Sequence, residues 1–166
     1  MKKLKKKIKK ILVILPNIQY GGTELVLIEV LNFLSKKGFQ IHLYTNISNS
    51  NLKLKKKLDN QIILTKSKSN FFVDTLNCYL ILRKNNIKTI FSLQSSIINA
   101  YLIKTFSLKK LELISRISTN ISSQYQASSL IVKIKLKVFS YCLSKSDTII
   151  VQSKNMKQDL INFLRI

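Results

Sequence analysis

Two adjacent glycines, Gly21 and Gly22, stand between a short apolar segment, residues 11–16, and a longer apolar-rich one, residues 25–33. This order predicts a buried strand, a tight turn and a helix that begins at Thr23. At the carboxyl end of a parallel strand, such a turn exposes backbone N–H groups with no Cβ in front of them. The positive end of the helix dipole points to the same place. The chemistry that suits this arrangement is the binding of an anion such as a phosphate.

The glycine pair matches neither of the two common phosphate-binding motifs. No third glycine follows it, as the dinucleotide fingerprint requires, and the Gly-Lys-Ser/Thr ending of a P-loop is missing. Spacing alone therefore leaves two interpretations open, a tight connection and a ligand contact. Glu24 in the first helical turn would stabilise the helix dipole, and it would repel a phosphate unless it faced away.

Two further polar clusters follow predicted strands. Ser92, Gln94 and Ser95 end one of them, and Arg116 and Asn120 follow the next. In a Rossmann-like strand order, the first and fourth strands flank the point at which the sheet changes direction. The first cluster and the glycine turn would therefore line one crevice. For the second cluster, a binding role and a solvated loop remain equally compatible with the sequence.

No catalytic set can be assembled from the other residues, so the catalytic residues are unknown at this point. His42 lies inside a predicted strand and is expected to pack there rather than act as a base. Cys78 and Cys142 are expected to be reduced thiols in or near the core. These three residues are far apart along the chain and form no ligand set, so no metal site is expected.

The elements that would position these residues alternate along the chain. Most of the predicted strands are continuously apolar, which is typical of a parallel sheet covered on both faces. One predicted helix ends at Gly38, and another has Ser153 as its N-cap. The alternation predicts a single α/β domain, Rossmann-like and doubly wound, with a mostly parallel sheet and helices on both faces. The expected strands are residues 8–15, 40–45, 61–64, 89–93, 111–117 and 148–151, and the expected helices are residues 23–37, 51–58, 71–86, 96–106 and 153–164.

The segment from residue 131 to residue 138 fits two elements. Lys133, Lys135 and Lys137 alternate with apolar residues, as they would in a strand. Ile131 and Ile134, together with apolar residues further on, also fit one face of a helix. The segment between the serine-rich flanks has about the length of a helix, so a helix is predicted.

Composition bounds the class of protein and its partners. At 166 residues and 46% hydrophobic residues, the chain is large enough for one domain with a real core. It has 29 Lys and Arg against 7 Asp and Glu, a formal net charge of +22. This charge indicates either a surface that seeks polyanions, such as an anionic membrane, or the codon bias of an A+T-rich genome. Nucleic acid is disfavoured as a partner because arginines and interleaved aromatic residues are sparse.

The amino terminus is strongly basic, and residues 1–7 are interpreted as a basic leader. The apolar segment that follows is too short for a signal peptide or a membrane span, and no other segment reaches spanning length without charged or amide residues. A cytoplasmic protein, soluble or peripheral on the cytoplasmic face of a membrane, is therefore expected.

A family resemblance is carried by the first strand, the turn formed by Gly21, Gly22, Thr23 and Glu24, and the apolar helix that follows. This order resembles the opening of the N-terminal domain of family 4 glycosyltransferases, which have the GT-B fold. Thr23 stands where the family more often has alanine. The spacing to residues 37–45 is also similar, and residues 144–160 resemble the closing strand and helix of that domain. The resemblance extends over residues 1–166 as one acceptor-side, Rossmann-like domain.

The resemblance implies transfer of a sugar from a nucleotide sugar to a glycan or lipid-linked acceptor, often in cell-envelope glycan biosynthesis. The nucleotide sugar would be a co-substrate, and no other cofactor is implied. Gly21, Gly22 and Thr23 match the loop near the donor diphosphate, where backbone N–H groups can stabilise the charge of the leaving group. The candidate acceptor-side cleft comprises Ser92, Gln94, Ser95, Arg116 and Asn120.

In that family a second Rossmann-like domain carries most of the nucleotide-sugar contacts, and residues 1–166 hold no counterpart to it. The expectation is half of a GT-B enzyme, truncated and inactive alone: a fragment, a domain of a longer protein, or a subunit with a separate C-terminal half. The alternative is a non-catalytic basic binding module, for an anionic membrane or nucleic acid, on a degenerate Rossmann scaffold. Steeply salt-dependent binding to nucleic acid would favour that alternative.

Overall fold

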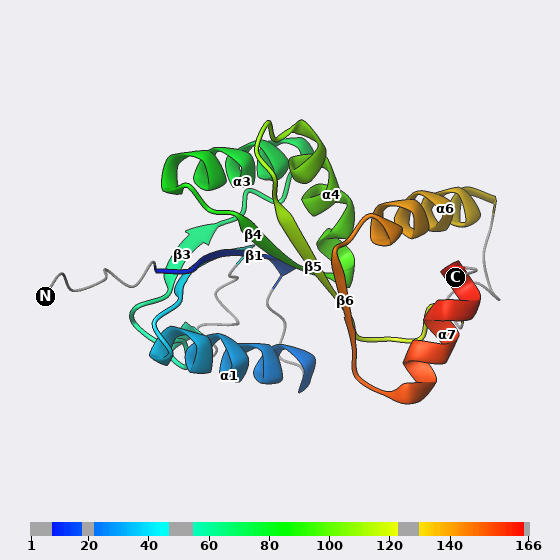
Figure 1. The fold of residues 1–166 in the computed structure, drawn as a ribbon, viewed down its shortest axis with the longest axis horizontal. Coiled ribbons are helices and arrows are strands. Elements are labelled where there is room, and N and C mark those ends of the chain that lie inside the picture. The colour runs from blue at the N-terminus through cyan, green and yellow to red at the C-terminus, as the bar shows by residue number, and fades with distance from the viewer. Residues whose placement is uncertain (1–7, 18–21, 47–54, 123–129, 165–166) are drawn as a thin grey trace, which may run out of the picture.

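The computed structural model describes residues 8–17, 22–46, 55–122 and 130–164, and its centre is one sheet (Figure 1). In this part of the chain the sheet has six strands, all parallel, in the order β3-β2-β1-β4-β5-β6. This order changes direction between β1 and β4, so the predicted doubly wound fold class is confirmed. The strands are β1 (Lys10–Asn17), β2 (Gln40–Asn46), β3 (Ile63–Lys66), β4 (Thr89–Leu93), β5 (Glu112–Ile117) and β6 (Thr148–Val151).

Helices cover both faces of the sheet (Figure 1). On β1, Leu12 and Ile14 belong to the core beneath α3 and α4, whereas Val13 and Leu15 pack with α1 on the other face. This explains why β1 is continuously apolar, because successive side chains of a strand point to opposite faces and both faces are buried here. The helices are α1 (Gly22–Lys36), α3 (Phe71–Asn85), α4 (Ile97–Phe106), α6 (Leu130–Ser144) and α7 (Lys154–Leu164).

The sequence predicted β4 and β6 with the bounds that the structure shows, and β1 and β3 two residues too early. The difference at β3 comes from a turn held by Asp59, which accepts a hydrogen bond from the Gln61 amide at its side chain and from the Ile62 amide at its carbonyl. Ile62 is buried in the core beside α1 although it lies in this turn. The apolar Ile62 side chain was therefore wrongly interpreted as part of the strand.

Two helix ends that single residues predicted are confirmed, whereas α1 begins at Gly22, one residue before the predicted Thr23. Gly38 follows α1 with φ of 86°, the left-handed region that favours glycine, and its amide donates to the Ser35 carbonyl at 2.8 Å. Before α7, the Ser153 hydroxyl accepts a hydrogen bond from the Met156 amide at 3.2 Å, as an N-cap does.

The segment with two possible periods forms a helix, α6, as predicted. Leu136 and Leu143, seven residues apart, are buried, whereas Lys133, Lys135 and Lys137 are exposed. Burial therefore follows the helical period rather than the alternation of a strand. The basic leader at residues 1–7 and residues 51–54 of the helix predicted at residues 51–58 lie outside the described residues. In the other half of that predicted helix only Lys55 is helical and residues 56–58 form a turn, so the prediction is wrong there.

Candidate functional site

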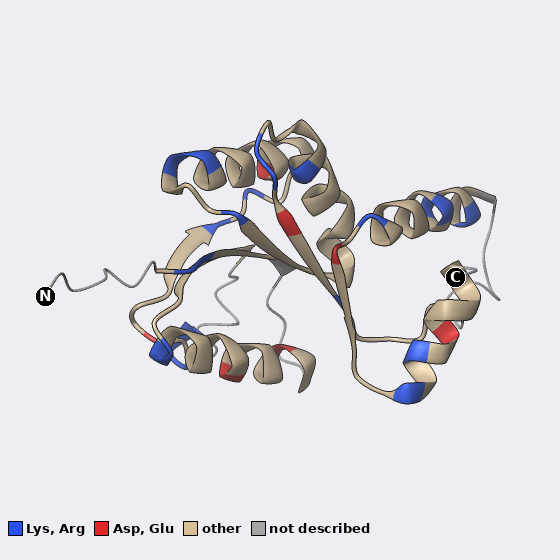
Figure 2. Cartoon of the chain, in the orientation of Figure 1, with Lys and Arg blue, Asp and Glu red and all other residues tan. Residues whose placement is uncertain are grey.

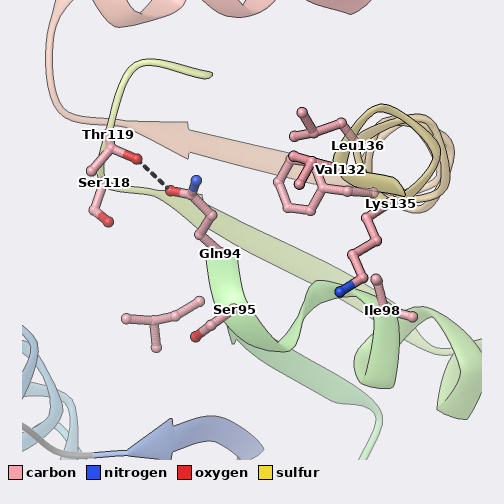
Figure 3. Close-up of a pocket in the computed structure, with 10 residues that line it drawn as sticks. Gln94, Ser95, Ile98, Ser118, Thr119, Val132, Lys135 and Leu136 are labelled. Atoms are coloured by element: carbon pink, nitrogen blue, oxygen red, sulfur yellow. Dashed lines mark hydrogen bonds between the residues drawn. The ribbon is translucent and has the colours of Figure 1, made fainter. Parts of the chain in front are cut away.

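The carboxyl ends of the strands meet at one edge of the sheet, and a cavity of about 550 Å³ opens there between β4, β5 and α6 (Figure 3). Gln94 and Ser95 line it directly after β4, as the sequence predicted for the end of that strand. The Thr119 hydroxyl, beyond β5, donates to the Gln94 amide oxygen at 3.0 Å and joins the two strand ends. The cavity is lined by Leu93, Gln94, Ser95, Ile98, Ser118, Thr119, Val132, Lys135, Leu136 and Phe139.

The turn that presents Gln94 and Ser95 is held in place by Ser96, which is completely buried. The Ser96 hydroxyl accepts from the Leu93 amide at 3.1 Å and lies 2.8 Å from the Ile14 carbonyl oxygen on β1. One side chain therefore satisfies backbone groups of two strands at the point where the sheet changes direction.

Replacement of Ser96 by alanine is expected to lower the free energy of unfolding by about 1–3 kcal/mol, because it leaves buried backbone groups without a partner. Urea denaturation would measure this loss. Ser95→Ala is the matched control and should change the stability little, since Ser95 is exposed. Equal stabilities of the two variants would contradict the structural role given to Ser96.

Ser92, assigned to the candidate cleft from the sequence, does not face a cavity. It is completely buried on β4, and its hydroxyl lies 3.1 Å from that of Ser115 on β5. The Ser115 hydroxyl lies in turn 2.7 Å from that of Ser146. The Ser92 and Ser115 hydroxyls pair inside the sheet, and Ser146, in the segment before β6, extends the chain of hydrogen bonds. Ser92 is therefore a structural residue in this fold.

Arg116 lies elsewhere than expected, on the side of the glycine turn rather than among the residues around Gln94. It is only 8% exposed, and its Nη1 donates to the Thr23 carbonyl oxygen at 3.4 Å, in the first turn of α1. Among the described residues Arg116 forms no ion pair with a carboxylate. A buried guanidinium and the positive end of the α1 dipole are therefore brought together at one place.

Of the predicted donor loop, Gly22 and Thr23 are described and Gly21 lies outside the described residues. Gly22 is the first residue of α1 and is exposed, and a Cβ added to it would meet no atom within 4 Å among the described residues. Among the described residues, nothing fills the space in front of this backbone, as a ligand contact requires. Asn120 is also exposed, and it does not line the cavity beside Gln94 and Ser95.

A second cavity at the same edge was missed in the sequence. It measures about 270 Å³, and Asp74, Asn99 and Ser95 contribute polar atoms to it. These residues come from α3, α4 and the turn after β4, and no spacing in the chain connects them. The one available signal was Asp74 itself, an acidic residue in a strongly basic chain.

The histidine and the two cysteines, which are the other reactive residue types in the chain, are buried in the fold. Burial, with a contribution from the charge of Lys10, lowers the pKa of His42, which is a buried strand residue as predicted. Cys78 and Cys142 are buried free thiols, and burial raises the pKa of both. Within the described residues no group of three or more His, Cys, Asp or Glu side chains is placed to hold a metal ion.

Comparison with solved structures identifies proteins with a similar fold. The chain is similar to sucrose-phosphate synthase from Thermosynechococcus elongatus, with a TM-score of 0.70 at 12% identity over 94% of this chain and 45% of that chain. It is also similar to a glycosyltransferase from Rickettsia africae ESF-5, with a TM-score of 0.56 at 17% identity over 87% of this chain and 42% of that one. The chain has the fold of one half of a GT-B glycosyltransferase.

The half-domain fold expected from the sequence resemblance is thus confirmed. The chain spans less than half the length of both structures. No family model and no curated protein matches its sequence.

Proposed function

We propose that the chain is the acceptor-side domain of a glycosyltransferase that moves a sugar from a nucleotide-sugar donor to a glycan or lipid-linked acceptor. The observation that carries the proposal is the position of Arg116, a buried cation without a carboxylate partner among the described residues, beside the first turn of α1. A buried charge is costly unless an opposite charge compensates it. A diphosphate at the open space before Gly22 would supply that charge.

The same arrangement suits the chemistry of sugar transfer. As the bond between the sugar and the diphosphate breaks, negative charge grows on the leaving group, and groups that bind this charge more tightly in the transition state lower the barrier. The first N–H groups of a helix have no partner within the helix. In this proposal the amides at the start of α1 and the Arg116 guanidinium stabilise the leaving diphosphate, while a second domain holds the nucleotide.

A thermal-shift experiment on this chain tests the anion site. Inorganic pyrophosphate should raise the melting temperature, by an amount that corresponds to about 2.7 kcal/mol at a concentration of roughly 100 Kd. Arg116→Met should weaken pyrophosphate binding about 10- to 100-fold, because it removes hydrogen bonds from a charged group. Methionine keeps an unbranched side chain of similar length, and loss of an uncompensated buried charge should leave the unliganded chain at least as stable.

Arg83→Met is the matched control, since Arg83 is an exposed arginine near the C-terminal end of α3 and bonds the Tyr79 hydroxyl. It removes the same charge from a distant place and should retain the response to pyrophosphate. Equal responses of the two variants, or no response of the unmodified chain, would contradict the anion site.

The transferase activity itself is tested in a protein that contains both halves. The coding sequence next to that of this chain would be read for a second α/β domain, and the joined protein would be assayed with UDP-, GDP- and ADP-sugars. Consumption of one nucleotide sugar in the presence of an acceptor is expected. A joined, folded protein that neither binds nor consumes any of these donors would contradict the proposed function.

An anionic membrane is proposed as a further partner because of the surface of α6. On this helix an apolar stripe is exposed although it belongs to a folded domain. The same helix carries lysines (Figure 2), and Lys133, Lys135 and Lys137 are exposed. An interfacial helix of this kind buries its apolar face at the membrane surface while its lysines contact anionic head groups. The stripe consists of Ile131, Ile134, Val138 and Tyr141, which are 66%, 56%, 45% and 55% exposed.

The membrane would be a docking surface rather than a medium that this part of the chain crosses. None of the described helices combines the length and the apolar character needed to traverse a bilayer. The proposal places the domain on the cytoplasmic face of the membrane, where a lipid-linked acceptor would be within reach.

A further inference from the structure

The cavity of about 270 Å³ lies on the α3 and α4 side of the sheet, at the carboxyl ends of β1 and β2. We refer to it as the Asp74 cavity. It shares Ser95 with the larger cavity beside α6, so the two adjoin at the point where the sheet changes direction. Its lining consists of Ile14, Tyr44, Ser67, Ser69, Phe71, Asp74, Ser95 and Asn99.

The charge of this cavity is opposite to that of the chain. Although the formal net charge is +22, no Lys or Arg is among the described residues that line it, and Asp74 is its one charged side chain. Burial alone would raise the pKa of Asp74, but hydrogen bonds from the Ser67 and Tyr44 hydroxyls and from backbone amides outweigh it and hold the pKa below its usual range. The carboxylate is therefore ionised at neutral pH, accepts hydrogen bonds only, and repels phosphates.

The polar atoms of the cavity are fixed in position. The Tyr44 hydroxyl donates to Asp74 Oδ1 at 2.7 Å, and the Ser67 hydroxyl donates to Oδ2 at 2.6 Å. Asn99 Nδ2 donates to the Thr75 hydroxyl at 2.8 Å, which orients the amide. A site whose polar groups are already held by neighbours loses little entropy when a ligand binds.

Apolar side chains also line the cavity. Phe71 begins α3 and packs edge-to-face against Phe72, with ring centroids 5.4 Å apart and planes at 90°. Phe71 lines the cavity together with Ile14, whereas Phe72 does not line it and is 80% exposed. An aromatic face beside hydrogen-bond acceptors matches a ligand that has an apolar C–H face and a rim of hydroxyl donors.

We propose that the Asp74 cavity binds a single neutral sugar ring, with a ring hydroxyl donating to Asp74 Oδ2 and Phe71 packing against the C–H face. Oδ1 already accepts from the Tyr44 hydroxyl and the Lys68 amide, whereas Oδ2 accepts only from the Ser67 hydroxyl among the described residues. The volume, slightly below the roughly 300–1,000 Å³ of drug-sized sites, suits one ring. That this ring belongs to the glycosyl acceptor rests on the proposed function. The binding of a neutral sugar does not depend on it, and the anion site at Arg116 lies on the other face of the sheet, toward α1.

Saturation-transfer NMR on this chain tests the inference with the methyl glycosides of glucose, galactose, mannose and N-acetylglucosamine as probes. At least one glycoside should bind saturably, and inorganic phosphate should not displace it. Phe71→Ala should weaken that binding roughly tenfold or more, as truncation of a central aromatic contact does. Phe72→Ala removes the adjacent ring of the same type outside the cavity and should change the affinity by less than about twofold.

Thermal unfolding of both variants would verify that each is folded, and a folded Asp74→Asn variant should lose selectivity against phosphate. Failure of all four glycosides to bind, equal losses in the two Phe variants, or displacement by phosphate would overturn the inference. Pyrophosphate binding without glycoside binding would overturn this inference alone. Glycoside binding without any response to pyrophosphate or nucleotide sugars would support this inference and contradict the proposed function.

Discussion

Replacement of Gly22 by valine is expected to reduce sugar transfer about 100- to 1,000-fold, in a protein that joins this chain to a donor-binding domain, while leaving its stability almost unchanged. The stability should hold because a Cβ at Gly22 enters open space at the start of α1. The activity should fall because the branched side chain fills the space in which the diphosphate would meet the first amides of the helix. Turnover with the nucleotide sugar and urea denaturation of the same preparations would measure the two effects.

The same substitution at Gly38 is the matched control, with the opposite expected pattern. Gly38 has φ of 86°, a conformation that costs a branched residue roughly 1–2 kcal/mol. Gly38→Val should therefore lower the free energy of unfolding and leave the turnover of the folded enzyme unchanged. Normal turnover of Gly22→Val would contradict the role given to the start of α1, and a large loss of its stability would contradict the open space described there.

Most of the fold could be predicted from local patterns, because each element depends on signals within its own segment. Continuously apolar strands separated by helical spacing were enough for a parallel sheet covered on both faces. Single residues with one physical role, such as Gly38 with its positive φ and Ser153 as an N-cap, set helix ends correctly. The predicted start of β3 was wrong because Ile62 lies in a turn and is nevertheless buried in the core. Only the folded chain reveals the contacts that bury it.

The sequence predicted the location of the candidate site, at the carboxyl ends of the strands, but not the directions in which its side chains point. Gln94 and Ser95 follow a strand, so their position at the edge of the sheet came from the topology. Arg116 and Ser92 lie within strands, where successive side chains point to opposite faces of the sheet. The sequence does not show which residues each of these two side chains contacts. Arg116 faces α1, and Ser92 pairs with Ser115.

The Asp74 cavity was beyond reach of sequence reasoning for a different reason. Its residues come from β1, β2, α3, the turn after β4 and α4, and from the segment after β3, so their proximity is a product of the tertiary fold. A motif has a recognisable spacing only when its members lie close together along the chain. The cavity combines groups from six segments. In the sequence, the one sign of it was Asp74, a carboxylate in a basic chain.

Replacement of Lys133, Lys135 and Lys137 by glutamine is expected to weaken binding to anionic vesicles about 100-fold, since each lysine near the surface contributes about 1 kcal/mol. All three lysines are exposed on α6, and they lie on both sides of the apolar stripe. The measurement is co-sedimentation with vesicles of phosphatidylcholine and phosphatidylglycerol at low and high salt, with pure phosphatidylcholine vesicles as reference. Binding of the unmodified chain should depend on the anionic lipid and decrease with salt.

The triple variant of Lys55, Lys56 and Lys57 to glutamine decides whether position or total charge matters. These lysines are also exposed and consecutive, but they lie between β2 and β3, away from the stripe. If the net charge of +22 only reflects composition, the two variants should lose vesicle binding equally. If α6 is the docking element, only the α6 variant should lose vesicle binding, and Ile134→Ser should weaken vesicle binding even though no charge changes.

Tighter binding to nucleic acid than to vesicles, reduced equally in both lysine variants, would instead favour a basic binding module without transferase function.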